Sequence, residues 1–286
     1  MASEITDSGS PASRHEVIDG CEVISCHPDD ADPPNRPPIL MVHGICHGAW
    51  CWEDNFLPFF ATHGWSSYAV SLRGHHRGAA AADVKGYAVD HYVEDVIAVA
   101  DRLHRPPVLI GHSMGGMVVQ KYLEDHQAPA AVLLASMPPQ GALRSPVIRR
   151  HPHVLMHGLV KRSVRTLVST PERCRALFFS NHTADDVVAQ CLSRLTEESN
   201  RVILDLLRYG TRRRPARLTT PMLVVGARED GLFSTSQVER TAALYGADTV
   251  ILSGTGHNVM LEPTWRQAAE YVESWLRRRL NDDQAG

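Results

Sequence analysis

The chain has 286 residues, of which 43% are hydrophobic and 21% charged, a globular composition that argues against wholesale disorder. Its formal net charge of −3 is too small to indicate a nucleic-acid or membrane-surface partner. The six cysteines suggest neither a disulfide framework nor a zinc motif, residues 1–14 lack a secretory signal, and no apolar run approaches the ~20 residues that span a bilayer. We therefore expect a reduced, cytoplasmic protein without a nucleic-acid or membrane partner.

Short apolar runs alternate with helical patterns along most of the chain. After a polar tail, residues 16–26 predict one or two edge strands, and a Pro- and Asp-rich turn follows at residues 28–38. Apolar runs without alternation, as in parallel strands buried on both faces, occupy residues 39–42, 67–70, 108–110, 131–134, 222–225 and 249–252. Helical patterns occupy residues 89–103, 114–126, 236–245 and 263–280. This order predicts an α/β fold, with a mostly parallel central sheet and helices on both faces.

The alternation stops between residues 136 and 217. This region has no convincing strand, but it contains helical stretches at residues 170–179 and 184–209. An all-helical insertion between two strands of a sheet predicts a cap over that sheet. We expect a flexible tail over residues 1–14, a core formed by residues 15–135 and 218–286, and a helical cap formed by residues 136–217.

A candidate nucleophile lies in the sequence Gly111-His112-Ser113-Met114-Gly115. This Gly-x-Ser-x-Gly pattern follows an apolar strand and precedes a helix, which is the context that gives the pattern its meaning. A sharp strand-to-helix turn exposes the serine hydroxyl, and only glycine permits the close packing on both sides. The sequence therefore predicts Ser113 as a nucleophile, with the N–H of Met114 directed at the substrate.

A serine hydroxyl needs a base to remove its proton, and location has to decide among the 16 histidines of the chain. His257 follows the last apolar strand and precedes the closing helix, so its loop can reach the serine. The base in turn needs a carboxylate that fixes its tautomer. Asp230 follows the strand at residues 222–225, and Glu229 is the rival acid. We predict that His257 is the base, that Asp230 orients it and that Glu229 forms a surface pair.

The tetrahedral oxyanion of acyl transfer requires hydrogen-bond donors besides the Met114 N–H. The loop after the strand at residues 39–42 begins His43-Gly44-Ile45. Its His-Gly pair allows the backbone to turn toward the serine, which makes the Ile45 N–H the second predicted donor. His43 is interpreted as structural. Gly44, His112 and Trp50, which lie in the two motifs, are the predicted substrate-binding residues.

These motifs resemble the α/β-hydrolase superfamily over roughly residues 16–280. The order Ser113, Asp230, His257 along the chain is the order of that fold. An Arg-Gly turn at residues 71–78 also matches, although Ser71 stands where the family often has Asp. More narrowly, residues 43–52 are similar to the plant methylesterase and hydroxynitrile lyase branch. That resemblance implies that Ile45 and Met114 donate the oxyanion hydrogen bonds.

Two departures from the lyases of that branch favour ester hydrolysis. The lyases typically carry Thr where this chain has Gly44, and Lys where it has Asn258, directly after the histidine. The Pro-rich segment before residue 39 and the long Arg-rich cap differ from the plant proteins, so the plant substrates do not carry over.

The sequence thus predicts a carboxylesterase that forms an acyl-enzyme on Ser113 and needs no cofactor or metal, because His257 activates both nucleophiles. Apolar residues of the cap suggest a small or medium hydrophobic ester, although we expect most of them to form the cap's own core: Leu155, Met156, Leu159, Leu177, Phe178 and Phe179. A lactonase, a C–C bond hydrolase, a tailoring enzyme of secondary metabolism and a non-catalytic ligand receptor remain alternatives. Epoxide hydrolases and haloalkane dehalogenases need a carboxylate at residue 113. A homodimer is compatible with the sequence.

Overall fold

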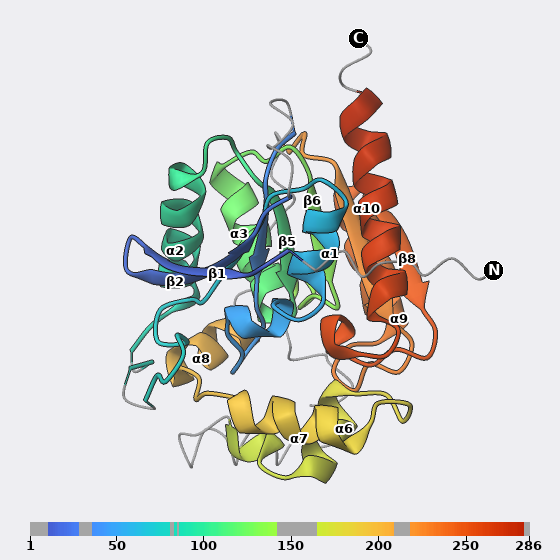
Figure 1. Ribbon diagram of the computed structural model, residues 1–286. Helices are drawn as coiled ribbons and strands as arrows, with labels where there is room; N and C mark the ends of the chain where they lie inside the picture. Colours follow the sequence, from blue (N-terminus) through green and yellow to red (C-terminus); the bar gives the residue numbers. More distant parts are fainter. Residues whose placement is uncertain are drawn as a thin grey trace, which may run out of the picture.

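The computed structural model describes residues 11–28, 36–80, 83–84, 86–141, 165–208 and 218–282. Within them, eight strands form one twisted sheet in the order β1-β2-β4-β3-β5-β6-β7-β8 (Figure 1). The strands are β1 (Arg14–Ile18), β2 (Cys21–Cys26), β3 (Ile39–Val42), β4 (Ser67–Val70), β5 (Val108–His112), β6 (Ala131–Leu134), β7 (Met222–Ala227) and β8 (Asp248–Leu252).

The pairing of the strands confirms the predicted fold class. Strands β4, β3, β5, β6, β7 and β8 run parallel, whereas β1 and β2 form an antiparallel extension at one edge. The central strands β3, β5, β6 and β7 are buried throughout, as their continuous apolar runs predict. Strand β8 differs from the expectation, because it lies at the other edge and is only partly buried.

Helices cover both faces of the sheet and divide the core into two layers. Ile39 and Met41 pack with α1 (Phe56–Thr62) and α10 (Trp265–Asp282), whereas Leu40 and Val42 face the opposite layer. This division follows from the two-residue period of a strand. The opposite layer includes α2 (Val89–Arg102), α3 (Met114–Asp125) and α9 (Thr235–Tyr245). The sequence pattern predicts every one of these helices except α1.

Helix α2 carries a buried charge, the carboxylate of Asp95. Asp95, which the amphipathic pattern places away from the core face, is only 3% exposed. Its carboxylate accepts hydrogen bonds from the Arg73 backbone N–H (2.8 Å) and from Arg73 Nε (2.7 Å). The carboxylate can be buried because these hydrogen bonds replace those that it would make to water. Asp95 thus fixes the Arg-Gly turn that follows β4.

The helical segment between β6 and β7 lies at one end of the sheet (Figure 1). It contains η3 (Arg165–Val168), α6 (Pro171–Phe178), α7 (Asp185–Arg194) and α8 (Asn200–Arg208). The expected single helical stretch at residues 184–209 is wrong, because α7 ends at Arg194. In the break, the backbone N–H of Thr196 donates to the Cys46 carbonyl oxygen at 2.9 Å, so residue 196 bonds to the core domain instead of to its own helix.

Some expectations fall outside the described residues. They concern residues 1–10 of the tail, most of the Pro-rich turn, and three apolar residues of the predicted cap: Leu155, Met156 and Leu159. In the part of the chain that the structure describes, no helix combines the length and the apolar character needed to cross a bilayer. The short helices η1 (Ala49–Trp52) and η4 (Val259–Leu261) complete the described elements, and both lie in loops that border the candidate site.

Candidate active site

Ser113 stands on a strained turn between β5 and α3. Its backbone angles are φ 52° and ψ −115°, a conformation with positive φ that side chains rarely adopt. The turn is tight, because a Cβ on Gly115 would collide with the backbone carbonyls of Val42 and His43. The glycine allows α3 to begin directly against the end of β3. The predicted sharp turn therefore exists, and it places Ser113 at the carboxyl end of the central strand.

Asp230 and His257 meet at the same edge of the sheet. Asp230 follows β7, and its Oδ1 accepts hydrogen bonds from the backbone N–H groups of Leu232 (2.7 Å) and Phe233 (3.0 Å). Its Oδ2 lies 2.9 Å from His257 Nδ1, and both side chains are almost completely buried. Glu229 instead points to His182, with 3.9 Å between Oε1 and Nε2. The geometry thus pairs the histidine with Asp230 and sends the rival acid to the surface.

The loop that carries His257 lies against the residue before the nucleophile. His112 Nε2 lies 3.0 Å from the carbonyl oxygen of His257, and the two imidazole rings are 4.8 Å apart. Because the Asp230 carboxylate accepts from Nδ1, the proton of a neutral His257 lies on Nδ1, and Nε2 keeps its lone pair. This Nε2 is buried and bonds to no other described residue. It is therefore a base whose acceptor position is open.

The loop after β3 is fixed by hydrogen bonds to its carbonyl oxygens. The Gly44 carbonyl faces His43 Nδ1 (2.8 Å) and accepts from the His47 N–H (3.2 Å). The Ile45 carbonyl faces His47 Nδ1 at 2.7 Å. Within the described residues, the N–H groups of Ile45 and Met114 have no hydrogen-bond partner. The two predicted oxyanion donors are therefore available to a ligand.

The two histidines of this loop are neutral structural residues. Burial lowers the pKa of His47 to about 4 and holds the pKa of His43 well below 6.5. Each uses its Nδ1–H for a loop carbonyl, so Nε2 is an acceptor. His43 Nε2 accepts from the Leu72 N–H at 3.0 Å, and His47 Nε2 lies 3.1 Å from Asn258 Nδ2. The interpretation of His43 as structural agrees with these bonds.

The residues predicted to bind substrate have different surroundings. Gly44 adjoins Ser113, whereas the His112 side chain is buried and engages the His257 loop. Trp50 stacks on His47, with 5.3 Å between the ring centroids. The Arg194 guanidinium lies over the Trp50 ring, with its Cζ 4.6 Å from the ring centroid. It borders a groove of about 680 Å³ between the loop after β4 and helix α7. Their contact with a substrate stays a prediction.

The buried apolar residues of η3, α6 and α7 lie mainly in a core of their own, whereas Val202 and Leu206 of α8 pack with the layer of α2 and α3. Phe178 and Phe179 are 3% and 5% exposed and pack with Cys174, Val188 and Cys191. Phe178 also stacks on the His257 ring, with the centroids 5.9 Å apart. At least one aromatic ring of this segment therefore borders the histidine.

Sequence reasoning missed a buried carboxylate beside the loop after β3. Glu198, in the break between α7 and α8, accepts from Tyr92 Oη at 2.7 Å and pairs with His75 Nε2 at 3.1 Å. The amphipathic pattern conceals it inside one long helix. Ser199 and Asn200 are residue types that begin helices, and they are the signal that could have revealed the break.

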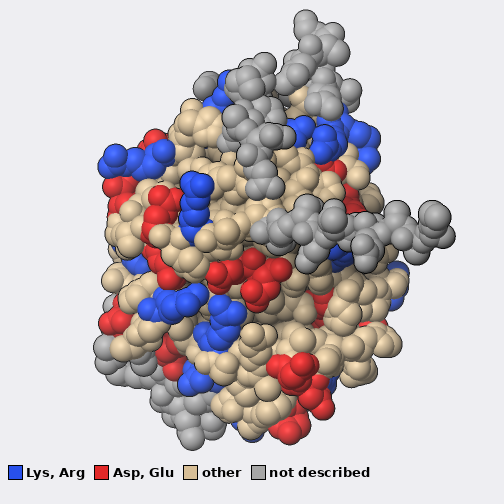
Figure 2. Space-filling model, in the orientation of Figure 1, with Lys and Arg blue, Asp and Glu red and all other residues tan. Residues whose placement is uncertain are grey.

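The described residues contain no group of three or more His, Cys, Asp or Glu side chains placed to hold a metal ion. On the face shown in Figure 2, acidic and basic side chains lie next to one another. Among the described ion pairs, Glu53 pairs with both Arg77 and Arg194, at 3.6 Å in each case. This face therefore offers short-range ion pairs and not one continuous basic surface.

Comparison of the sequence with known proteins gives a family match and several relatives. The sequence profile of the alpha/beta hydrolase family matches residues 39–273. The chain is 37% identical over 116 residues to a non-heme chloroperoxidase of Burkholderia pyrrocinia, covering 38% of this chain and 41% of that protein. It is 32% identical over 114 residues to a pFDCC methylesterase of Arabidopsis thaliana, covering 38% and 42%. The matches thus span about two fifths of the length of these curated relatives.

Among solved structures, an esterase from Exiguobacterium antarcticum superimposes with a TM-score of 0.71 at 17% identity, covering 92% of this chain and 98% of that one. At this identity the likeness describes the fold. The expected similarity to plant methylesterases is confirmed by the Arabidopsis relative.

Proposed function

The chain belongs to the alpha/beta hydrolase family, and on that premise we propose that it is a serine carboxylesterase that works through an acyl-enzyme on Ser113. The observation that carries the proposal is the 2.9 Å hydrogen bond between His257 and Asp230 at the strand edge where Ser113 stands on its strained turn. Both features support the assignment of Ser113, His257 and Asp230 to a catalytic triad.

In the acylation step, His257 Nε2 takes the proton of Ser113 while Oγ attacks the ester carbonyl. Asp230 stabilises the imidazolium that forms, because its carboxylate is already oriented by two backbone N–H groups. The N–H groups of Ile45 and Met114 bind the oxyanion. His257 then donates its proton to the departing alcohol, and the acyl group stays on Ser113. Preorganised donors of this kind are worth several kcal/mol in the transition state.

In the deacylation step, water replaces the alcohol. His257 removes a proton from the water, the resulting tetrahedral intermediate uses the same two N–H donors, and its collapse returns the proton to Ser113 and releases the acid. Every proton transfer in this cycle uses His257 Nε2, so Ser113, His257, Asp230 and the two backbone N–H donors suffice for the chemistry.

We assign the helical segment between β6 and β7 to a cap that selects the substrate. Phe178 stacks on His257 from this segment, which supports an ester with a small or medium hydrophobic group. The lyase alternative lacks support in the site, because Asn258 is uncharged and its Nδ2 is directed to His47 and Cys191. Cleavage of a cyanohydrin calls for a cation near the histidine to stabilise the departing cyanide.

The test is turnover of short p-nitrophenyl esters by the wild type and by Ser113→Ala. We expect hydrolysis and fluorophosphonate labelling by the wild type, and a loss on the order of 10⁴–10⁶ in kcat for the variant. Mandelonitrile should release no cyanide above background. Labelling that persists in Ser113→Ala would identify another nucleophile, and cyanide release at a rate comparable to ester turnover would overturn the esterase proposal.

A further inference from the structure

The buried carboxylate of Glu198 contacts the loop that carries the Ile45 N–H. Glu198 is 1% exposed, and its side chain and that of His75 are both completely shielded from solvent. Apart from the loop itself, three donors contact this carboxylate: His75 Nε2 at 3.1 Å, Tyr92 Oη at 2.7 Å and the Ser199 N–H at 2.9 Å. Burying a charge in this way is costly unless it is paired and hydrogen-bonded, and here it is both.

The pKa shifts of both groups favour the charged form of the pair. Burial alone would raise the pKa of Glu198, but the charge of His75 and the hydrogen bonds from His75, Tyr92 and Ser199 bring it below its ordinary value. Burial likewise disfavours the charged form of His75, and the carboxylate outweighs it, so the pKa of His75 is raised. The site therefore contributes a carboxylate whose charge is compensated locally, and it adds little repulsion to an oxyanion formed nearby.

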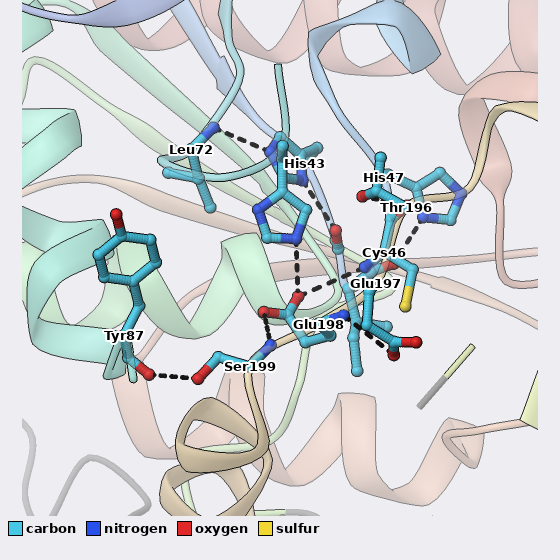
Figure 3. Close-up of polar contacts among 12 residues, drawn as sticks. His43, Cys46, His47, Leu72, Tyr87, Thr196, Glu197, Glu198 and Ser199 are labelled. Carbon is cyan, nitrogen blue, oxygen red and sulfur yellow. Dashed lines mark hydrogen bonds and ion pairs between the residues drawn. The ribbon is translucent and has the colours of Figure 1, made fainter. Parts of the chain in front are cut away.

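The carboxylate contacts the loop through Cys46. The Cys46 N–H donates to Glu198 Oε2 at 3.4 Å (Figure 3). On its other side, the Cys46 carbonyl accepts from the Thr196 N–H at 2.9 Å and from Thr196 Oγ1 at 3.3 Å. Cys46 has φ 62°, a left-handed conformation that a residue with a side chain adopts only when its surroundings enforce it. The break between α7 and α8 supplies those surroundings.

The backbone of Cys46 is continuous with the donor of the proposed oxyanion hole. The Gly44 carbonyl shares a peptide plane with the Ile45 N–H, and it is bound by His43 and His47. The next peptide plane holds the Ile45 carbonyl, bound by His47, and the Cys46 N–H, bound by Glu198, and the plane after it is fixed by Thr196 at the Cys46 carbonyl. Among these fixed groups, the Ile45 N–H is left without a partner in the described chain. An N–H donor that is fixed in this way needs little reorganisation when negative charge develops on the substrate oxygen.

We propose that Glu198 is a positioning residue for the oxyanion hole: through Cys46, its carboxylate holds the Ile45 N–H in the direction that the tetrahedral intermediate needs. The inference rests on the proposed function, because it concerns the same site. It also makes the segment between β6 and β7 a part of the catalytic geometry, since Thr196 and Glu198 both come from it.

The expected signature is a loss in the transition state alone. Glu198→Gln keeps the shape of the side chain but removes the charge that the Cys46 N–H and His75 need. Deleting an oxyanion donor outright costs about 10²–10³ in kcat, so a misdirected donor should cost about tenfold, with KM changed less than twofold. Thr196→Val removes only the hydroxyl bond to the Cys46 carbonyl and should show a smaller change of the same kind.

A pair of inhibitors separates this role from a structural one. A trifluoromethyl ketone forms a hemiketal with Ser113 whose oxyanion occupies the hole, whereas the corresponding alcohol binds without an adduct. We expect the inhibition constant of the ketone to rise in Glu198→Gln by the factor by which kcat falls, while that of the alcohol stays constant. Glu273→Gln is the control, because Glu273 is a buried carboxylate on α10 that bonds to Trp65 and Arg277 instead.

The outcomes are distinct. Equal weakening of ketone and alcohol in Glu198→Gln would show that Glu198 shapes only the pocket, and unchanged kinetics would overturn the inference. If Glu198→Gln does not fold, Thr196→Val decides, because it leaves the buried pair intact. A wild type that neither hydrolyses esters nor binds the ketone would refute the proposed function itself. A wild type that does both, beside an unaffected Glu198→Gln, would refute the inference alone.

Discussion

The backbone of Gly44 lies against the nucleophile: a Cβ added at residue 44 would be 3.0 Å from Ser113 Cβ and 2.8 Å from His112 Nδ1. The loop after β3 therefore has no room for a side chain at this point. We expect Gly44→Ala to push the loop away from Ser113 and to lower kcat about 10- to 100-fold, because small displacements of a preorganised site are costly. Steady-state kinetics with a short p-nitrophenyl ester would check this, and an unchanged kcat would show that the loop is not held rigidly against Ser113.

The two adjacent acids should differ sharply in their effect on activity. Asp230→Asn removes the charge that orients His257, and we expect a loss in kcat on the order of 10³–10⁴. Glu229→Gln should retain nearly full activity, because Glu229 reaches only His182 at 3.9 Å. The two substitutions lie at adjacent residues and each removes one negative charge, so each variant is the control of the other. The reverse ranking of their kcat values would contradict the assignment of Asp230.

The strained backbone conformation of Ser113 should lower the free energy of unfolding of the protein. Its φ of 52° disfavours any residue with a Cβ, whereas glycine adopts such angles freely. We expect Ser113→Gly to be more stable than Ser113→Ala by about 1 kcal/mol, although both are inactive. Urea unfolding followed by circular dichroism would measure the difference. If the alanine variant were equally stable, the surroundings and not the turn itself would dominate the strain.

The Glu198–His75 pair predicts a pH window of stability. The pKa of His75 is raised above 6.5, so its contribution is complete below 6.5 and is lost as the pH rises through the raised value. The pKa of Glu198 is lowered below 4.5, so its contribution is complete above 4.5 and is lost as the pH falls through the lowered value. The other groups that face the pair, Tyr92 and the buried His43, are neutral in this range.

Wild type and Glu198→Gln should therefore differ most in their free energy of unfolding between about pH 4.5 and 6.5. Breaking a buried pair costs on the order of 3 kcal/mol, and the difference should shrink above this window as His75 loses its proton. Urea denaturation at pH 5.5 and 8.5 would compare the two proteins. A difference that is independent of pH would mean that His75 is not charged in the folded protein.

The sequence was sufficient for most of the sheet and for the pairing of His257 with Asp230. Parallel strands buried on both faces leave continuous apolar runs, and the loops after them are where polar residues such as Asp230 collect. One strand was misjudged: β8 reads as an interior strand although it lies at an edge and is only partly buried, because its sequence does not record that it has a single neighbour.

The contacts around Glu198 could not be predicted from the sequence, for a different reason. Residues 184–209 have an amphipathic pattern that continues across the break, so the pattern alone predicts one helix. What ends α7 is a long-range contact, namely the hydrogen bonds of Thr196 and Glu198 to Cys46. Helix α1 was missed similarly, since Phe56, Leu57, Phe59 and Phe60 are all buried and leave no polar face to reveal a helical period.

The position of the helical segment between β6 and β7 has a consequence for biosynthesis. The two strands pair in register, Ala131 with Met222, although the whole segment separates them along the chain. A growing chain therefore presents Ser113 long before it contains Asp230 or His257, and closing so long a loop costs chain entropy before β7 and β8 can dock. Under the proposed function, the nascent protein holds a nucleophile without a base, and it gains catalytic power only when its last strands join the sheet. Return of ester turnover during refolding should accordingly lag behind formation of the N-terminal strands and mark the completion of the fold.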